Sequence, residues 1–195
     1  MHTCLIKRIQ QFICLDNNDI LTIQTLFKKK ELRKGEFFLK ENLINQELAF
    51  VVKGILYYSV TTDDQETVHN FACEGTFVCN YDSFINKTPS KKNITALEDT
   101  TLLFISYSNL QHFYKKIKEG EKFGRLLIEE AYTLSINQIL SFYNKSPEIR
   151  YQEFIAEFPD LAQRIPQYYI AAYIGIKPQS LSRIRKKMSS RHLLT

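Results

Sequence analysis

The residues best suited to bind another molecule lie in a basic segment near the end of the chain. Residues 177–195 contain six Lys and Arg residues and no acidic residue, whereas residues 1–176 contain 20 basic and 21 acidic residues. At about 100° per residue, a helix in this segment places Gln179, Arg183 and Lys186 on one face. Gln pairs bidentately with adenine and Arg with guanine, and Lys contacts phosphates. We therefore expect this face to bind double-stranded DNA.

Hydroxyl and basic side chains flank this face and complete the candidate DNA-binding surface. The predicted contacts are Lys177, Gln179, Ser180, Ser182, Arg183, Lys186 and Lys187. The alternative is a charged, solvated helix that binds nothing. A basic cluster without further features is more often such a solvated surface than a binding site.

The spacing of small and apolar residues around this segment predicts a helix-turn-helix. Ala171 supplies the small side chain that two crossing helices need at their closest approach, and Gly175 suits a sharp turn with positive φ. Pro178 is favourable in the first turn of a helix. Leu181 and Ile184 fall on the side opposite the donor face, so we expect them in the core.

Short β-rich runs separated by turn signals fill the first half of the chain. The predicted strands span residues 37–40, 48–53, 55–61, 67–73, 94–97 and 101–106. Several short strands with no helical pattern between them indicate an antiparallel sandwich or barrel. Before them, apolar residues at spacings of three and four within residues 5–27 predict two short helices that break near Asp16.

A proline-free segment, residues 119–144, predicts a long helix with an apolar stripe. Such a helix of about 25 residues extends for about 38 Å, and its surplus apolar surface needs a partner. That partner is either another domain or a second copy of the chain. The predicted dimerisation residues are Phe123, Leu127, Ala131 and Leu134. The alternative is a helix buried within its own monomer.

The sequence contains no pattern typical of an enzyme or a metal centre. Cys4, Cys14, Cys73 and Cys79 form no CxxC pair, and the four histidines are far apart. His69 and Cys73 share a predicted strand, where packing is a simpler role than haem ligation. No Ser/His/Asp, Walker or dinucleotide motif is present. We therefore expect no catalytic activity and no cofactor.

No stretch approaches the roughly 18 apolar residues that a membrane span needs. The N-terminal residues also lack the cleavage site of a signal peptide. We expect a cytoplasmic protein without a membrane partner.

Five segments resemble the bacterial Crp/Fnr transcription regulators. Residues 181–187, Leu-Ser-Arg-Ile-Arg-Lys-Lys, are similar to the recognition helix of that family. Residues 32–38, 50–54, 74–77 and 96–102 resemble strands and turns of its cyclic-nucleotide-binding β-roll. The resemblance covers nearly the whole chain.

The resemblance implies an α+β protein in three parts. These are N-terminal helices with an antiparallel β-roll sensor (1–118), a long dimerisation helix (119–145) and a C-terminal helix-turn-helix DNA-binding domain (146–195). It also implies a homodimer that binds a two-fold symmetric operator, with half-sites about one helical turn apart. RNA polymerase is a further expected partner.

The residues that bind cyclic AMP in this family have no counterpart here. Cyclic-AMP-binding members carry a Gly-Glu pair, where this chain has Cys-Asn-Tyr-Asp-Ser-Phe at 79–84, and an Arg, whose position falls near the Ser-Lys-Lys run at 90–92. Lys cannot offer a phosphate the bidentate fork of Arg. We therefore expect a regulator that cyclic AMP does not control. The candidate pocket for another small-molecule effector comprises Tyr81, Phe84, Lys91 and Lys92.

The alternative function is a β-roll that senses a ligand or docks on another protein without binding DNA sequence-specifically. It predicts no salt-dependent binding to duplex DNA, whereas a regulator that contacts phosphates must show a steep salt dependence.

Overall fold

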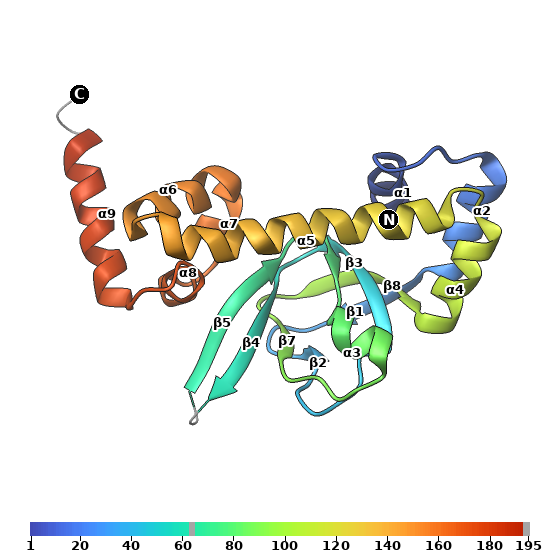
Figure 1. Ribbon diagram of the computed structural model, residues 1–195, viewed down its shortest axis with the longest axis horizontal. Coiled ribbons are helices and arrows are strands. Elements are labelled where there is room, and N and C mark those ends of the chain that lie inside the picture. The colour runs from blue at the N-terminus through green and yellow to red at the C-terminus, as the bar shows by residue number, and fades with distance from the viewer. Residues whose placement is uncertain (63–64, 193–195) are drawn as a thin grey trace. The chain divides into compact units, whose positions relative to one another are not determined.

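The computed structural model describes residues 1–62 and 65–192, and the chain divides into two compact units (Figure 1). The first comprises Met1–Glu66 and Asn70–Tyr132, and the second comprises Thr67–His69 and Thr133–Thr195. The long helix α5 (Gly120–Asn144) contributes to both units. The helix predicted over residues 119–144 is thus present, and the units divide within it.

The first unit contains two four-stranded sheets. One has the strand order β1 (Lys28–Leu32), β8 (Thr100–Ser106), β3 (Glu47–Lys53), β6 (Phe77–Val78). The other has the order β2 (Phe37–Leu39), β7 (Asn93–Ala96), β4 (Leu56–Thr62), β5 (Gln65–Ala72). The strand pairs with a determined register are antiparallel. The predicted α+β class with an antiparallel roll is confirmed.

Strand β3 shows how the sheets are packed, because its two faces belong to different cores. Leu48 and Phe50 join an apolar cluster with the N-terminal helices and α5. Ala49 and Val51 join a second cluster that includes residues of β4 and β7 from the other sheet. Since side chains alternate along a strand, one face of this sheet carries helices and the other faces the second sheet.

Three helices of the first unit pack beside this first sheet: α1 (His2–Gln10), α2 (Asn17–Leu26) and α4 (Tyr107–Lys116). Asp16 begins α2 with a capping box, since its carboxylate accepts from the Asp19 amide and the Asp19 carboxylate accepts from the Asp16 amide. The predicted break near Asp16 is therefore a helix start. The ring of Phe113 in α4 packs against the ring of Phe123 in α5, with 5.6 Å between the ring centres.

Four short elements were not predicted: β1, β6, α3 (Tyr81–Asn86) and α7 (Pro159–Arg164). Strand β1 reads Lys-Lys-Lys-Glu-Leu and lies at a sheet edge, where charged residues are common and apolar alternation is weak. The other three contain six residues or fewer, too few to show a period.

The second unit holds the C-terminal helices α6 (Pro147–Glu157), α7, α8 (Gln167–Tyr173) and α9 (Pro178–His192). Helix α6 starts at Ser146, whose hydroxyl accepts from the Ile149 amide, with Pro147 in the first turn. The core contains Tyr151, Phe154, Leu161, Ile165, Ile170 and Leu181, all nearly inaccessible to solvent.

Candidate nucleic-acid interface

A tight turn joins α8 to α9. Gly175 has a φ of 72°, a value that glycine adopts without the steric cost other residues pay. Its amide donates to the Ala172 carbonyl at 3.0 Å, and the Ile176 amide donates to the Ala171 carbonyl at 2.9 Å. Ala171 is completely buried. The small residue and the glycine therefore lie where the two helices require them.

Helix α9 has one buried side and one exposed polar side. Leu181 and Ile184 are buried, as their positions on the helix predict. All seven predicted DNA contacts are exposed: Lys177, Gln179, Ser180, Ser182, Arg183, Lys186 and Lys187. Helix α9 contains no Asp or Glu. Its outer side therefore presents amide, hydroxyl, guanidinium and ammonium groups and no carboxylate that would repel phosphate.

The stripe predicted to mediate dimerisation begins inside the first unit. Phe123 is 1% exposed and contacts the rings of Phe12, Phe77 and Phe113. Leu127 packs partly against the same cluster. Core packing therefore leaves Phe123 almost no surface for a partner. Ala131 and Leu134, further along the stripe, are exposed.

A second apolar stripe runs along α5 on the face opposite Leu134. It comprises Ile128, Tyr132, Ile136, Ile139 and Tyr143 and is here called the 128–143 stripe. Its spacings of four, four, three and four residues are those of a coiled-coil seam. Tyr132, Ile139 and Tyr143 are 67%, 51% and 85% exposed. Ile128 and Ile136 are half-buried. The stripe therefore presents three large apolar side chains to solvent.

The four candidate effector residues differ sharply in exposure. Tyr81 and Lys91 are exposed and Lys92 is half-buried, whereas Phe84 is 1% exposed and packs on the ring of Tyr107. Burial lowers the pKa of Lys92. Two surface hollows, of about 300 and 280 Å³, are lined by other residues. Phe84 is a buried side chain of the first unit, and its place in an effector pocket stays a prediction.

A buried hydrogen-bond network links the segment around Asn80 to Asn45 and Ser90, where the sequence resemblance leads us to expect the nucleotide site. The side-chain Nδ2 of Asn80 donates to the Ser90 hydroxyl at 2.7 Å, and the backbone N–H of Asn80 donates to Oδ1 of Asn45 at 2.8 Å. The Asn45 amide donates to the Ser83 hydroxyl at 2.9 Å. All four residues are at most 5% exposed. These polar groups therefore satisfy one another.

Tyr58 and Cys79 lie next to this network. Tyr58 belongs to the cluster between the sheets, and its hydroxyl accepts a 3.3 Å hydrogen bond from the Cys79 amide. Burial raises the pKa of the Tyr58 hydroxyl and raises the pKa of the Cys79 thiol to about 12. Both groups are therefore neutral near pH 7, and a phenol ring fills space between the sheets.

No local sequence pattern predicts a role for Phe142, Arg150 or Tyr58. Arg150 binds the carbonyl of Ile174, a residue 24 positions away, so no local pattern marks it. Tyr58 is one of several aromatic residues in predicted strands, and only the packing distinguishes it.

Part of the first unit is similar to a known domain family. Residues 29–117 match the cyclic nucleotide-binding domain family. The first unit therefore includes a segment similar to cyclic nucleotide-binding domains. FixK2 from Bradyrhizobium japonicum has a similar structure, with a TM-score of 0.74 and 15% identity over 85% of this chain and 86% of that chain. A comparison with curated proteins gives no significant match.

Two further structures extend the similarity beyond the cyclic nucleotide-binding domain. The c-di-GMP-responsive regulator CLP from Xanthomonas campestris has a TM-score of 0.66 and 16% identity over 91% of this chain and 94% of that chain. A protein described as a Crp/Fnr family regulator from Eubacterium rectale has a TM-score of 0.66 and 15% identity over 91% and 85%. The chain therefore has the Crp/Fnr fold, and the resemblance inferred from its sequence is confirmed.

Membrane-spanning helices and clustered metal ligands are both absent from the described residues. None of their helices is long and apolar enough to cross a membrane. They also contain no group of three or more His, Cys, Asp or Glu residues placed to hold a metal ion.

Proposed function

We propose that this protein is a DNA-binding transcriptional regulator of the Crp/Fnr type that binds a two-fold symmetric operator as a homodimer. The observation that carries the proposal is the two-sided character of α9. Leu181 and Ile184 are buried on one side, while Gln179, Arg183 and Lys186 are exposed on the other, and α9 itself contains no Asp or Glu. With α8 and the Gly175 turn, this forms a helix-turn-helix whose second helix enters the major groove.

Each group on α9 has a role in this proposal. Gln179 and Arg183 read base edges, because amide and guanidinium groups pair bidentately with adenine and guanine. Lys177, Lys186 and Lys187, with Ser180 and Ser182, bind phosphates and set the register.

Dimerisation through α5 supplies the second half-site. The 128–143 stripe is the seam we favour, because Tyr132, Ile139 and Tyr143 are exposed and the stripe has coiled-coil spacing. Residues 1–118 then act as the sensor domain, 119–145 as the dimerisation helix and 146–195 as the DNA-binding domain. The expected setting is the cytoplasm, with RNA polymerase as a further partner.

Cyclic AMP does not regulate this protein in our proposal. The Asn80 and Ser90 side chains bind each other rather than a ribose or a phosphate, and Tyr58 fills space between the sheets. No Arg lies between Arg33 and Arg125 to bind a phosphate bidentately. If another effector exists, Tyr81, Lys91 and Lys92 are the exposed or half-exposed groups that could meet it.

The deciding experiment is selection from a random duplex library by the purified full-length protein at two salt concentrations. We expect an enriched inverted repeat. If three lysines of each protomer contact phosphates, six contacts give a slope of about −5 in log K against log salt. No binding at low salt would refute the proposal and favour a module that docks on protein.

A further inference from the structure

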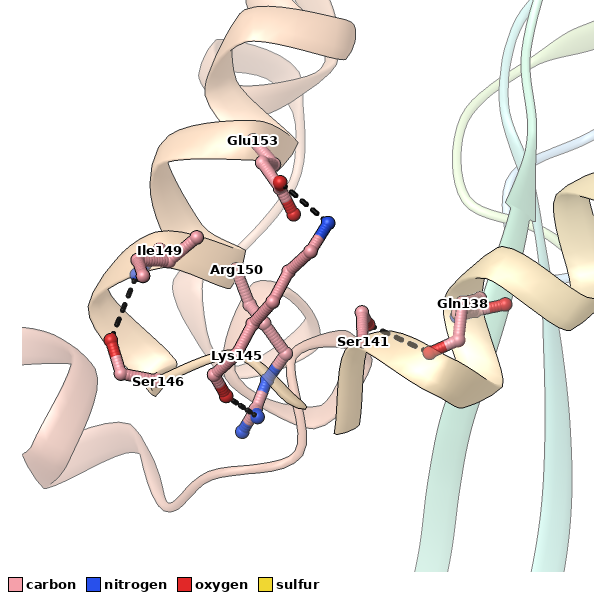
Figure 2. A network of polar contacts seen from close by, with 7 residues as sticks. All are labelled: Gln138, Ser141, Lys145, Ser146, Ile149, Arg150 and Glu153. Carbon is pink, nitrogen blue, oxygen red and sulfur yellow. Dashed lines mark hydrogen bonds and ion pairs between the residues drawn. The ribbon is translucent and has the colours of Figure 1, made fainter. Parts of the chain in front are cut away.

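One guanidinium group joins the ends of two helices in the second unit. The Nε of Arg150 donates to the Ile174 carbonyl at 2.9 Å, and its Nη1 donates to the Lys145 carbonyl at 2.8 Å. Figure 2 shows Arg150 extending from α6 back to the Lys145 carbonyl. Lys145 directly follows α5, and Ile174 directly follows α8. Arg150 therefore caps both helices at once.

The last carbonyls of a helix lack partners within the helix and carry partial negative charge. A cation placed there satisfies the carbonyls and complements both dipoles. Ile174 is only 1% exposed, so water cannot easily replace Arg150 at that carbonyl. Loss of the Arg150 side chain would therefore leave the buried Ile174 carbonyl without this hydrogen bond, at a cost in stability.

An aromatic ring completes the connection between α5 and the turn. The Arg150 guanidinium carbon lies 5.1 Å from the centre of the Phe142 ring, and Phe142 belongs to the last turns of α5. The same ring lies against Gly175, where an added Cβ would come within 2.7 Å of Phe142 Cε1. Phe142, Arg150 and Gly175 thus form a continuous contact from the end of α5 to the turn before α9.

We propose that Arg150 is a positioning residue that holds the α8–α9 pair at one fixed angle on the end of α5. The consequence at DNA rests on the proposed function: if α5 forms the dimer, this angle sets the distance between the two recognition helices. A Lys could not replace Arg150, because two carbonyls in different directions and a ring face require a planar group with several donors.

The test at DNA uses the selected operator with its half-sites moved apart or together by one and two base pairs. Each added base pair rotates one half-site by about 34° relative to the other. We expect the wild-type protein to lose about tenfold in affinity per base-pair change. In Arg150→Gln and Arg150→Lys this penalty should fall to about two- to threefold. An equal loss at every spacing would show a merely stabilising role and overturn the proposal.

Glu153→Gln is the matched control. It removes the 2.7 Å ion pair between Lys145 and Glu153 at the same helix junction (Figure 2). The two carbonyl groups that Arg150 contacts belong to the backbone of Lys145 and Ile174 and are unchanged by this substitution. Glu153→Gln should keep the wild-type preference for spacing. Arg150→Lys guards against misfolding, because it retains the positive charge at the two helix ends.

A second readout does not need DNA. Hydrogen exchange of the backbone amides of residues 174–177 should be at least tenfold faster in Arg150→Gln than in the wild type or Glu153→Gln. Unchanged exchange would overturn the proposal even if the protein binds DNA. Faster exchange with no duplex binding by the wild type would support the positioning role of Arg150 and refute the proposed DNA function.

Discussion

The ring of Phe142 lies so close to Gly175 that no other residue fits there without movement. A Cβ built on Gly175 would come within 2.7 Å of Phe142 Cε1. Gly175 also has a φ of 72°, which disfavours a side chain regardless of space. Two separate features therefore favour glycine at this position: the positive φ of the backbone and the nearby Phe142 ring. A change at Phe142 removes the second and leaves the first.

Gly175→Ala should lower the free energy of unfolding by about 2–4 kcal/mol, of which the left-handed backbone accounts for about 1–2 and overpacking for the rest. In a Phe142→Ala background the same substitution should cost only about 1–2 kcal/mol, since the clash is gone. Urea titrations followed by circular dichroism of the four proteins measure the difference. An equal cost in both backgrounds would mean that the ring does not limit the residue at 175.

Arg183 and Lys187 should differ in what their removal does to DNA binding. Arg183→Ala should relax the preference at one base pair of each half-site, at a cost of about 1–3 kcal/mol. Lys187→Ala should weaken binding to operator and scrambled duplex alike and reduce the salt slope by about 1 per protomer. Titrations of both duplexes at several salt concentrations distinguish these outcomes. If Arg183→Ala weakens both duplexes equally, Arg183 contacts phosphate instead.

The two faces of α5 can be compared directly, because Ile139 and Leu134 are similarly exposed, at 51% and 56%, on opposite sides of the helix. Ile139→Asp, within the 128–143 stripe, should weaken the dimer at least 100-fold, since it buries a carboxylate in an apolar seam. Leu134→Asp should leave the dimer largely intact. Sedimentation velocity over a range of concentrations measures both.

Asn137→Asp is the control for this comparison, because it adds the same charge at an exposed polar position of the same helix. Leu127→Asp is a poorer probe, since Leu127 packs partly against its own core and the change would also reduce stability. Dissociation by Leu134→Asp but not by Ile139→Asp would return the seam to the stripe first predicted from the sequence.

The sequence predicts the apolar stripes of α5 but not which of them is covered by the rest of the chain. Both sets of apolar residues have helical spacing, so periodicity alone could not decide which one the chain covers. The face that contains Phe123 is covered by aromatic residues from the turn after α1, from β6 and from α4, which no local pattern reveals. For α9 the sequence was more informative, because only one side of that helix is apolar and the position of Leu181 follows directly.

The strands were predicted to within two residues wherever they carry apolar alternation, as for β3 and β8. Strand β1 was missed because its three lysines hide the pattern. Arg150 was missed for a different reason: its two carbonyl partners belong to turns that meet only in the folded protein. Such contacts depend on tertiary structure rather than on residue type.

Cyclic AMP at 1 mM should leave the thermal midpoint of this protein unchanged. A ligand with a Kd of about 10 μM would add about 2.7 kcal/mol of stability at that concentration, which shifts the midpoint by several degrees. Here Asn80 and Ser90 are engaged with each other at 2.7 Å, and the Tyr58 hydroxyl is bound to the Cys79 amide. A nucleotide would have to break these buried contacts and would find no guanidinium in return. AMP at the same concentration controls for ionic effects, and a saturable rise with cyclic AMP alone would show that the network opens for the nucleotide.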